Sequence, residues 1–192
     1  MIQKERKTKE TKISISLDDE RSPDDSVLST GVGFFDHMLT LFSFHSGIYL
    51  NVEADGDLEV DDHHTVEDVG IILGQMIREL YTEKASYQRY GTTYIPMDES
   101  LARVVLDLSG RPHLNFQAHF SKEKVGTFDT ELVLEFFNAV SMNSRMTLHI
   151  DLLKGGNTHH EIEAIFKAFA RSLKDALTAN NIGVPSSKGV IE

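Results

Sequence analysis

Hydrophobic residues follow two different periods along this chain. Over residues 9–18 apolar and polar side chains alternate, which is typical of a strand with one buried face. Over residues 61–80 apolar residues recur at steps of three and four, the stripe of an amphipathic helix. Similar segments return later in the sequence. They predict strands over 9–18, 48–52, 99–107, 113–120 and 146–152, and helices over 31–47, 61–80, 130–140 and 158–173.

The predicted elements occur twice in the same order. Glu10 aligns with Glu99 at an offset of 89, since 99 − 10 = 89, and His63 aligns with His159 at 96, since 159 − 63 = 96. The offset changes only where loops differ in length. A repeated strand-helix unit predicts an α+β fold of two pseudo-symmetric half-domains, with paired β-sheets and helices massed on one side. We expect one domain, 1–192, made of half-domains of about 1–90 and 91–192.

Composition and charge restrict the classes of function. The chain has 192 residues, 40% of them hydrophobic and 26% charged, as is usual for a soluble globular protein. Nineteen basic and 30 acidic side chains give a net charge of -11, which argues against a nucleic-acid partner. No segment resembles a membrane span or a secretory signal, so we expect a cytoplasmic protein. Cysteine is absent, so a transition-metal site must use imidazole and carboxylate ligands.

A His-His-x-x-Glu motif begins both long predicted helices. Positions i and i+4 share a helix face, so the first histidine and the glutamate of each copy can chelate one metal ion. These chelating pairs are His63 with Glu67 and His159 with Glu163. The second histidine, His64 or His160, points about 100° away around the helix. If a pseudo-two-fold axis relates the halves, each of these two histidines serves the ion of the other half.

The preceding predicted helix supplies a further ligand for each ion. His37 aligns with Glu135, since 135 − 37 = 98, the offset found for the following strand. These two residues are the candidate fourth ligands. Nitrogen and oxygen donors without sulfur suit Mn, Fe or Zn in a site with open positions, and the spacing does not choose among these metals.

Five segments taken together resemble the imidazoleglycerol-phosphate dehydratase family. They are TGVGFFDHML, DDHHTVEDVGIILG, RYGTTYIPMDESLARVVLDLSGRP, GGNTHHEIEAIFKAFARSL and PSSKGV, which extend over nearly the whole chain. The resemblance implies a lyase of histidine biosynthesis that converts D-erythro-imidazoleglycerol phosphate to imidazole-acetol phosphate and water. It further implies two Mn²⁺ ions bridged by the substrate imidazolate, and a homo-oligomer of twenty-four subunits with active sites between neighbours.

The resemblance also implies how the ligands are shared. It groups His37 and His64 with His159 and Glu163, and His63 and Glu67 with His160. Many family members carry histidine where this chain has Glu135. A carboxylate is a suitable ligand for manganese, so we expect Glu135 to bind the ion directly. The alternative is that Glu135 is a helix-surface carboxylate and that water fills the position.

Several residues match positions that contact the substrate in the family. They are His45, Arg89, Arg111, Lys167, Ser186, Ser187 and Lys188. Guanidinium groups bind phosphate through two hydrogen bonds, and lysine acts as a point charge. The alternative for a single arginine is a surface ion pair. For Lys167 alone, a surface ion pair is the preferred interpretation. His45 has the alternative of a packed histidine on an apolar helix.

A general acid or base is also required near the glycerol carbons. Glu10 matches a family glutamate that contacts substrate and is the candidate, with its copy Glu99 as the alternative. Four aspartates are candidates either to orient ligand imidazoles or to cap helices: Asp36, Asp61, Asp62 and Asp68. Three histidines outside the motifs are assigned no role: His113, His119 and His149.

Two other functions are compatible with the motifs. A dinuclear metallohydrolase acting on a phosphorylated small molecule would also need paired ions near cationic residues. A metal-templated assembly protein would use the ions only to hold subunits together.

Overall fold

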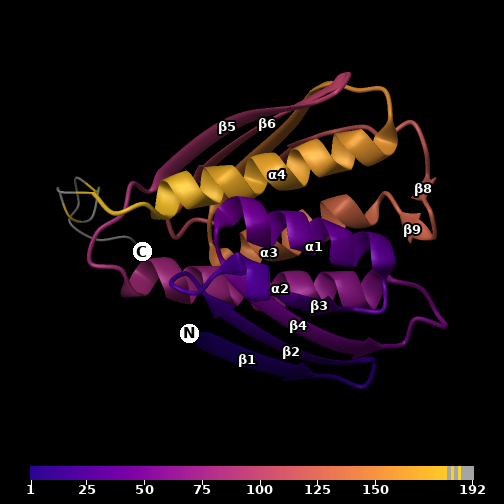
Figure 1. The fold of residues 1–192 in the computed structure, drawn as a ribbon, viewed down its shortest axis with the longest axis horizontal. Coiled ribbons are helices and arrows are strands. Elements are labelled where there is room, and N and C mark those ends of the chain that lie inside the picture. The colour runs from indigo at the N-terminus through magenta and orange to yellow at the C-terminus, as the bar shows by residue number, and fades with distance from the viewer. Residues whose placement is uncertain (181–182, 184–185, 187–192) are drawn as a thin grey trace.

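The computed structural model describes residues 1–180, 183 and 186, which form two four-stranded sheets, one two-stranded sheet and four α-helices (Figure 1). The strands are β1 (Ile2–Lys7), β2 (Thr11–Asp18), β3 (Val27–Ser29), β4 (Tyr49–Gly56), β5 (Tyr90–Met97), β6 (Ser100–Asp107), β7 (His113–Gln117), β8 (Lys124–Val125), β9 (Phe128–Asp129) and β10 (Thr147–Lys154). The helices are α1 (Gly33–Ser46), α2 (His63–Glu83), α3 (Leu132–Ser144) and α4 (Thr158–Leu177), and a 3₁₀ turn, η1, spans Pro23–Asp25.

The two large sheets have the same topology. Their strand orders are β1-β2-β4-β3 and β5-β6-β10-β7, and in each the last pair is parallel while the other pairs are antiparallel. This confirms the predicted α+β fold of two duplicated half-domains. The helices lie on one side of each sheet. Because the halves meet through their helices, the two sheets form the outer layers of the molecule (Figure 1).

The helices of one half pack against those of the other. Helix α1 contacts α4, and α3 contacts α2, while α2 lies on β1 and β2 and α4 lies on β5 and β6. A single core of buried apolar side chains runs through both halves. It includes an edge-to-face contact between Phe35 of α1 and Phe136 of α3, whose ring centroids are 5.3 Å apart. The short helix of each half is thereby brought against the motif-bearing helix of the other half.

Two glycines permit close packing around these helices. A β-carbon added at Gly74 of α2 would lie 2.7 Å from the carbonyl oxygen of Val140 in α3. A β-carbon at Gly91 of β5 would lie 1.9 Å from the carbonyl oxygen of Ser172 in α4. Both distances are far shorter than a van der Waals contact, so the backbones approach closely only because these positions lack side chains.

Strands β1 and β5 were not predicted, for different reasons. The inward side of β1 carries Lys4 and Arg6 instead of an apolar run, and these pair with carboxylates of α2, Glu79 at 2.6 Å and Asp68 at 2.7 Å. Strand β5 contains Gly91 and Pro96, which break a strand pattern, but β5 is an edge strand, where proline is tolerated. The three-residue strand β3 is too short to give a periodic signal.

Several boundaries also differ from the prediction. Strand β4 continues beyond its predicted end at residue 52 as far as Gly56, because β4 stays paired with β2 up to the Thr11–Gly56 pair. Helices α2 and α4 extend to Glu83 and Leu177, one turn beyond the predicted ends. The additional turns bury Tyr81 and Leu177, so tertiary packing lengthens both helices.

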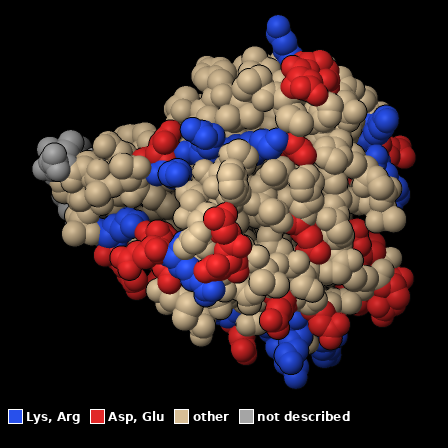
Figure 2. All heavy atoms as spheres, in the orientation of Figure 1, with Lys and Arg blue, Asp and Glu red and all other residues tan. Residues whose placement is uncertain are grey.

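The surface carries mixed charge. Figure 2 shows acidic and basic side chains interspersed over the face drawn there, which does not form one continuous basic surface. None of the described helices combines the length and apolarity needed to cross a bilayer.

Candidate active site

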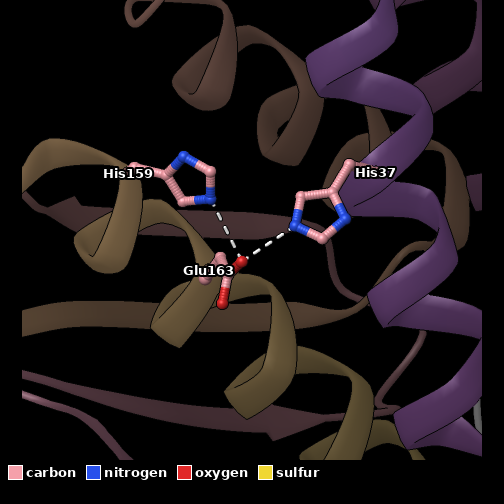
Figure 3. Close-up of side chains that lie close together, drawn as sticks. All are labelled: His37, His159 and Glu163. Carbon is pink, nitrogen blue, oxygen red and sulfur yellow. Dashed lines mark hydrogen bonds and ion pairs between the residues drawn. The ribbon is translucent and has the colours of Figure 1, made fainter.

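His37 of α1 and His159 of α4 converge on one oxygen of Glu163 (Figure 3). The Nε2 atom of His37 lies 2.8 Å from Oε1 of Glu163, and Nε2 of His159 lies 3.1 Å from the same atom. The ligand atoms of this group all lie within 4.8 Å of one another, a spacing that one metal ion can bridge. The predicted chelating pair of α4 therefore does share a helix face, and α1 of the other half adds a third donor.

Glu163 is buried, and its second carboxylate oxygen is also engaged. Lys167, one turn further along α4, donates to Oε2 at 2.6 Å and also lies 3.5 Å from the sulfur of Met97. Burial by itself raises the pKa of Glu163, but hydrogen bonds from Lys167, His37 and His159 outweigh it and lower the pKa to about 2. The carboxylate is therefore ionised. Lys167 forms an ion pair, as preferred for it from the sequence, but the pair is with a buried carboxylate and does not lie at the surface.

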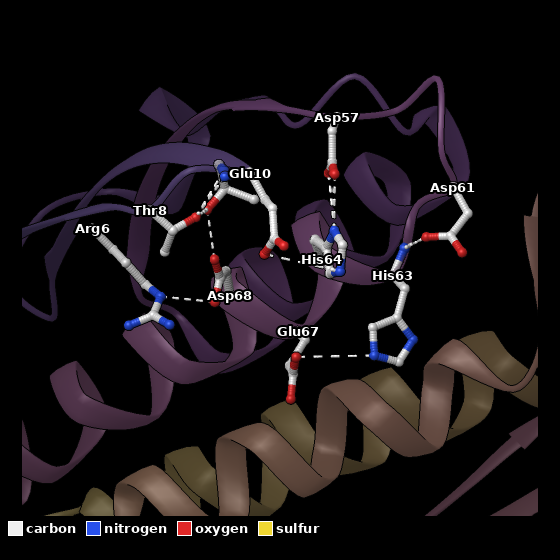
Figure 4. A network of polar contacts seen from close by, with 10 residues as sticks. Arg6, Thr8, Glu10, Asp57, Asp61, His63, His64, Glu67 and Asp68 are labelled. Atoms are coloured by element: carbon white, nitrogen blue, oxygen red, sulfur yellow. Dashed lines mark hydrogen bonds and ion pairs between the residues drawn. The ribbon is translucent and has the colours of Figure 1, made fainter.

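The copy of this arrangement in the first half is more open. The Nε2 atom of His63 lies 3.9 Å from Oε2 of Glu67 on α2, and both side chains are half-exposed (Figure 4). Glu135 occupies on α3 the position that His37 occupies on α1, and α3 packs against α2. In the described part of the chain, Glu135 belongs to neither of the two groups of three whose ligand atoms lie within 4.8 Å.

The second histidine of each motif faces a carboxylate of its own half. The Nδ1 atom of His64 lies 3.0 and 3.1 Å from the two oxygens of Asp57, in the loop between β4 and α2 (Figure 4). The Nδ1 atom of His160 lies 3.2 Å from Oε2 of Glu99, in the turn between β5 and β6. Neither histidine joins the chelating pair of the other half within the described residues of one chain. The cause is their position on the helix, which turns them away from the contact between halves.

Glu10 and Glu99 occupy equivalent turns but have different surroundings. The carboxylate of Glu99 accepts hydrogen bonds from the backbone N–H of Asn157 at 2.8 Å and from the Ser100 hydroxyl at 3.0 Å. Hydrogen bonds lower the pKa of Glu99 to about 2. The backbone N–H of Asn157 makes the largest contribution, and the bonds with His160 and Ser100 add to it. Glu10 is exposed, and its Oε2 lies 4.0 Å from Nε2 of His64.

The two predicted phosphate-binding arginines share an aspartate at the other end of β6. Arg89 pairs with Asp107 through Nε at 2.6 Å and Nη2 at 3.1 Å, and Nη2 of Arg111 lies 3.7 Å from the same carboxylate. Strand β6 has 8 residues at a rise of about 3.3 Å, so Asp107 stands about 25 Å from Glu99. Within one chain the arginines are therefore distant from Glu99 and from His160, which Glu99 contacts.

His45 lies on α1, two turns after His37, and faces α4. Burial, followed by the positive charges of Lys167 and Arg171, lowers the pKa of His45, so its imidazole is neutral near pH 7. Of the remaining predicted substrate residues, Ser186 lies among the described residues, and Ser187 and Lys188 lie outside them.

Three of the four aspartates considered as orienting groups contact other partners, and no hydrogen bond to a histidine ring is found for the fourth, Asp62, among the described residues. Asp36 accepts from the backbone and hydroxyl of Thr30, and Asp61 accepts from the backbone N–H of His63 at the start of α2. Asp68 binds Arg6 and Thr11, and the burial of Asp62 raises its pKa. The carboxylates that face Nδ1 of the second histidine of each motif are Asp57 and Glu99. No motif in the sequence identifies Asp57 as a partner of His64. Glu99 lies 61 positions from His160, so the spacing along the chain does not link these two residues.

Comparison with known proteins identifies the family of the chain. The family described as imidazoleglycerol-phosphate dehydratase matches residues 30–173. An imidazoleglycerol-phosphate dehydratase of Staphylococcus aureus strain JH9 is 65% identical over 193 residues, covering all of both chains. A crystal structure of this dehydratase from S. aureus N315 has a TM-score of 0.83 and 62% identity, covering 93% of this chain and 98% of that one. The crystal structure of IGPD from Pyrococcus furiosus in complex with (S)-C348 has a TM-score of 0.85 and 36% identity, with 97% and 99% coverage. The chain belongs to the imidazoleglycerol-phosphate dehydratase family.

Proposed function

We propose that this chain dehydrates D-erythro-imidazoleglycerol phosphate to imidazole-acetol phosphate and water, as a metal-dependent hydro-lyase of histidine biosynthesis in the cytoplasm. The observation that carries the proposal is the group of His37, His159 and Glu163, in which helices of both halves supply donors around one carboxylate oxygen. Membership of the dehydratase family supplies the reaction class.

The donor atoms of this group suit manganese. Two imidazole nitrogens and an ionised carboxylate, without sulfur, are ligands that Mn²⁺ accepts. We assign one ion to His37, His159 and Glu163. A second ion is assigned by pseudo-symmetry to His63 and Glu67, with Glu135 as the counterpart of His37.

The two sites are completed by neighbouring subunits. His64 and His160 do not reach the chelating pair of the opposite half within one chain. Arg89 and Arg111 stand about 25 Å along β6 from Glu99, far beyond the reach of the three carbons that join ring to phosphate. A site with all of these groups must combine chains. We therefore propose a homo-oligomer with active sites at subunit interfaces, for which the family resemblance implies twenty-four subunits.

Dehydration breaks the C–O bond on the carbon attached to the ring and the C–H bond on the next carbon, and the resulting enol becomes the ketone. When bound, the two ions supply Lewis-acid stabilisation of the deprotonated imidazole ring. Glu10 moves the proton, because its carboxylate is exposed and near His64 and has no hydrogen-bond partner among the described residues. Glu99 is unsuited to this role because three groups already donate to its carboxylate.

The phosphate end of the substrate is bound by the guanidinium groups of Arg89 and Arg111. Asp107 forms ion pairs with both arginines, which restricts the orientations of their guanidinium groups. We assign the hydroxyl and ammonium groups of the C-terminal segment, Ser186, Ser187 and Lys188, to the same phosphate. Neutral His45 and the ammonium of Lys167 are assigned to the substrate near the first ion.

The test is an assay of the Mn²⁺-loaded protein with imidazoleglycerol phosphate, measuring both ketone product and inorganic phosphate. We expect ketone to form without phosphate release, and EDTA to abolish the reaction. Release of phosphate would overturn the proposal in favour of a dinuclear metallohydrolase. A matched Arg111→Ala variant should keep its oligomer size, measured by light scattering, and lose turnover. Full turnover in that variant would remove Arg111 from the site.

A further inference from the structure

The second histidine of each motif has the same environment in both halves, although the residues that create it differ. In the first half, Asp57 in the β4–α2 loop places both carboxylate oxygens against Nδ1 of His64, at 3.0 and 3.1 Å. In the second half, Glu99 in the β5–β6 turn places Oε2 3.2 Å from Nδ1 of His160. The two carboxylates come from turns that do not correspond in the duplication.

The equivalent positions make different contacts in the two halves. The turn residue of the first half that corresponds to Glu99 is Glu10, which approaches Nε2 of His64 at 4.0 Å and not Nδ1. The start of α4, which corresponds to the Asp57 loop, contributes the backbone N–H of Asn157, and this N–H holds Glu99 in place at 2.8 Å. Each half therefore places a carboxylate against Nδ1 of its second histidine from a different loop.

A carboxylate at Nδ1 has a defined chemical effect on an imidazole. It accepts the Nδ1 proton, so the lone pair resides on Nε2, and it fixes the plane of the ring. The carboxylate of Glu99 is also held itself: its Oε1 accepts from the backbone N–H of Asn157 and from the Ser100 hydroxyl at 3.0 Å. A carboxylate that is already bonded in this way is fitted to orient the ring. It is poorly suited to bind a third ion with Asp98, whose side chain is 74% exposed.

We propose that Asp57 and Glu99 are positioning residues, which orient His64 and His160 so that Nε2 of each ring is presented to a metal ion. This inference rests on the proposed function, because it requires that both histidines are ligands. It assigns to Glu99 a role distinct from that of Glu10, its counterpart in the duplication. It also explains why the motif carries two adjacent histidines: the first chelates with the glutamate one turn away, and the second is directed by a carboxylate outside the helix.

The experiment measures Mn²⁺ affinity of the full-length apo protein by isothermal titration calorimetry. The variants are Asp57→Ala, Asp57→Asn, Glu99→Ala and Glu99→Gln. The controls are Asp55→Ala, an exposed neighbour of Asp57, and Asp98→Asn, whose carboxylate lies 3.8 Å from His160. We expect the alanine variants and Glu99→Gln to raise the Kd for Mn²⁺ by about 10- to 100-fold, the usual effect of losing an orienting partner. Asp57→Asn keeps one acceptor at Nδ1 and should recover part of the affinity. The controls should stay within about twofold of the unsubstituted protein.

The melting temperature of each apo variant separates orientation from folding. Glu99→Gln retains the acceptor for the N–H of Asn157, so its melting temperature should match that of the unsubstituted protein while its Mn²⁺ affinity falls. Unchanged Mn²⁺ affinity in Glu99→Gln and Asp57→Ala, with the unsubstituted protein binding two ions per active site, would overturn this inference alone. A protein that binds no Mn²⁺ at all would overturn the proposed function, and the inference with it.

Discussion

The Nε2 atom of His37 lies 2.8 Å from Oε1 of Glu163, although 126 residues separate the two in the sequence. The contact joins α1 of the first half to α4 of the second, and His159 reaches the same oxygen. Glu163 is the centre of the group, because its Oε1 contacts both histidines and its Oε2 accepts from Lys167. Removal of its charge should therefore affect the site more than removal of any single histidine.

The first prediction concerns Glu163→Gln. The substitution keeps the shape of the side chain and removes the charge that an ion would contact, so we expect the loss of one of two bound Mn²⁺ ions, measured by elemental analysis. Turnover should fall at least ~100-fold. Glu53→Gln, on the outer face of β4, is the control and should retain both ions. Full metal content in Glu163→Gln would exclude Glu163 as a ligand.

Glu10→Gln is predicted to separate binding from turnover. The amide cannot move a proton, so kcat should fall at least ~100-fold, the usual contribution of acid-base catalysis, while KM changes little. Steady-state kinetics on the Mn²⁺-loaded protein gives both values. Glu5→Gln, an exposed position on β1, serves as the comparison. If kcat is unchanged, the proton-transfer role must pass to another group.

Glu135→Ala tests whether the carboxylate of α3 replaces the histidine that the family resemblance leads us to expect at this position. If Glu135 is a ligand, the ion beside His63 and Glu67 should lose occupancy while the ion beside His159 and Glu163 is retained. Anomalous scattering from crystals of the Mn²⁺-bound protein measures the two occupancies separately. Full occupancy of both ions would remove Glu135 from the ligand list and leave water in that position. Glu135→His should restore occupancy.

Gly74→Ala is predicted to destabilise the fold without involving the site. The added β-carbon would lie 2.7 Å from the carbonyl oxygen of Val140, so α2 and α3 must separate. We expect a loss of about 1–3 kcal/mol in the free energy of unfolding, typical of overpacking, from denaturant titration. Gly33→Ala is a matched helical control, because a β-carbon there meets no atom within 4 Å. Equal stability of both variants would contradict the close helix contact.

The stability of the protein should fall at high pH through Tyr87. Burial, together with the neighbouring Tyr81, raises the pKa of Tyr87 to about 12 from an unfolded value of 10.0. A raised folded pKa gives a stabilising contribution that is complete below about pH 10 and is lost as pH rises through about 12. Melting temperatures measured from pH 8 to 12 should therefore fall less steeply in Tyr87→Phe than in the unsubstituted protein. Parallel curves would show that Tyr87 ionises as freely as in the unfolded chain.

The sequence by itself determined the features that depend on neighbours along one element. Helical periodicity was sufficient to place His159 and Glu163 on one face of α4, since residues four apart lie one turn from each other. Internal alignment was sufficient for the duplicated α+β fold, because both copies keep the same alternation of periods. The equivalence of Glu10 and Glu99 in the two β-turns followed from the same alignment.

Contacts between residues of different elements do not follow from periodicity or internal alignment, and for His37 only the family resemblance implied a grouping with His159 and Glu163. The approach of His37 to Glu163 depends on how α1 packs against α4, and no spacing in the sequence encodes that packing. Strand β1 was missed because its inward charges are stabilised by ion pairs with α2, which exist only after folding. Asp57, rather than a nearer aspartate, faces His64 because the loop after β4 returns over the start of α2. Local periodicity fixes neighbours within a helix or strand, whereas contacts between elements are set by the packing of the whole core.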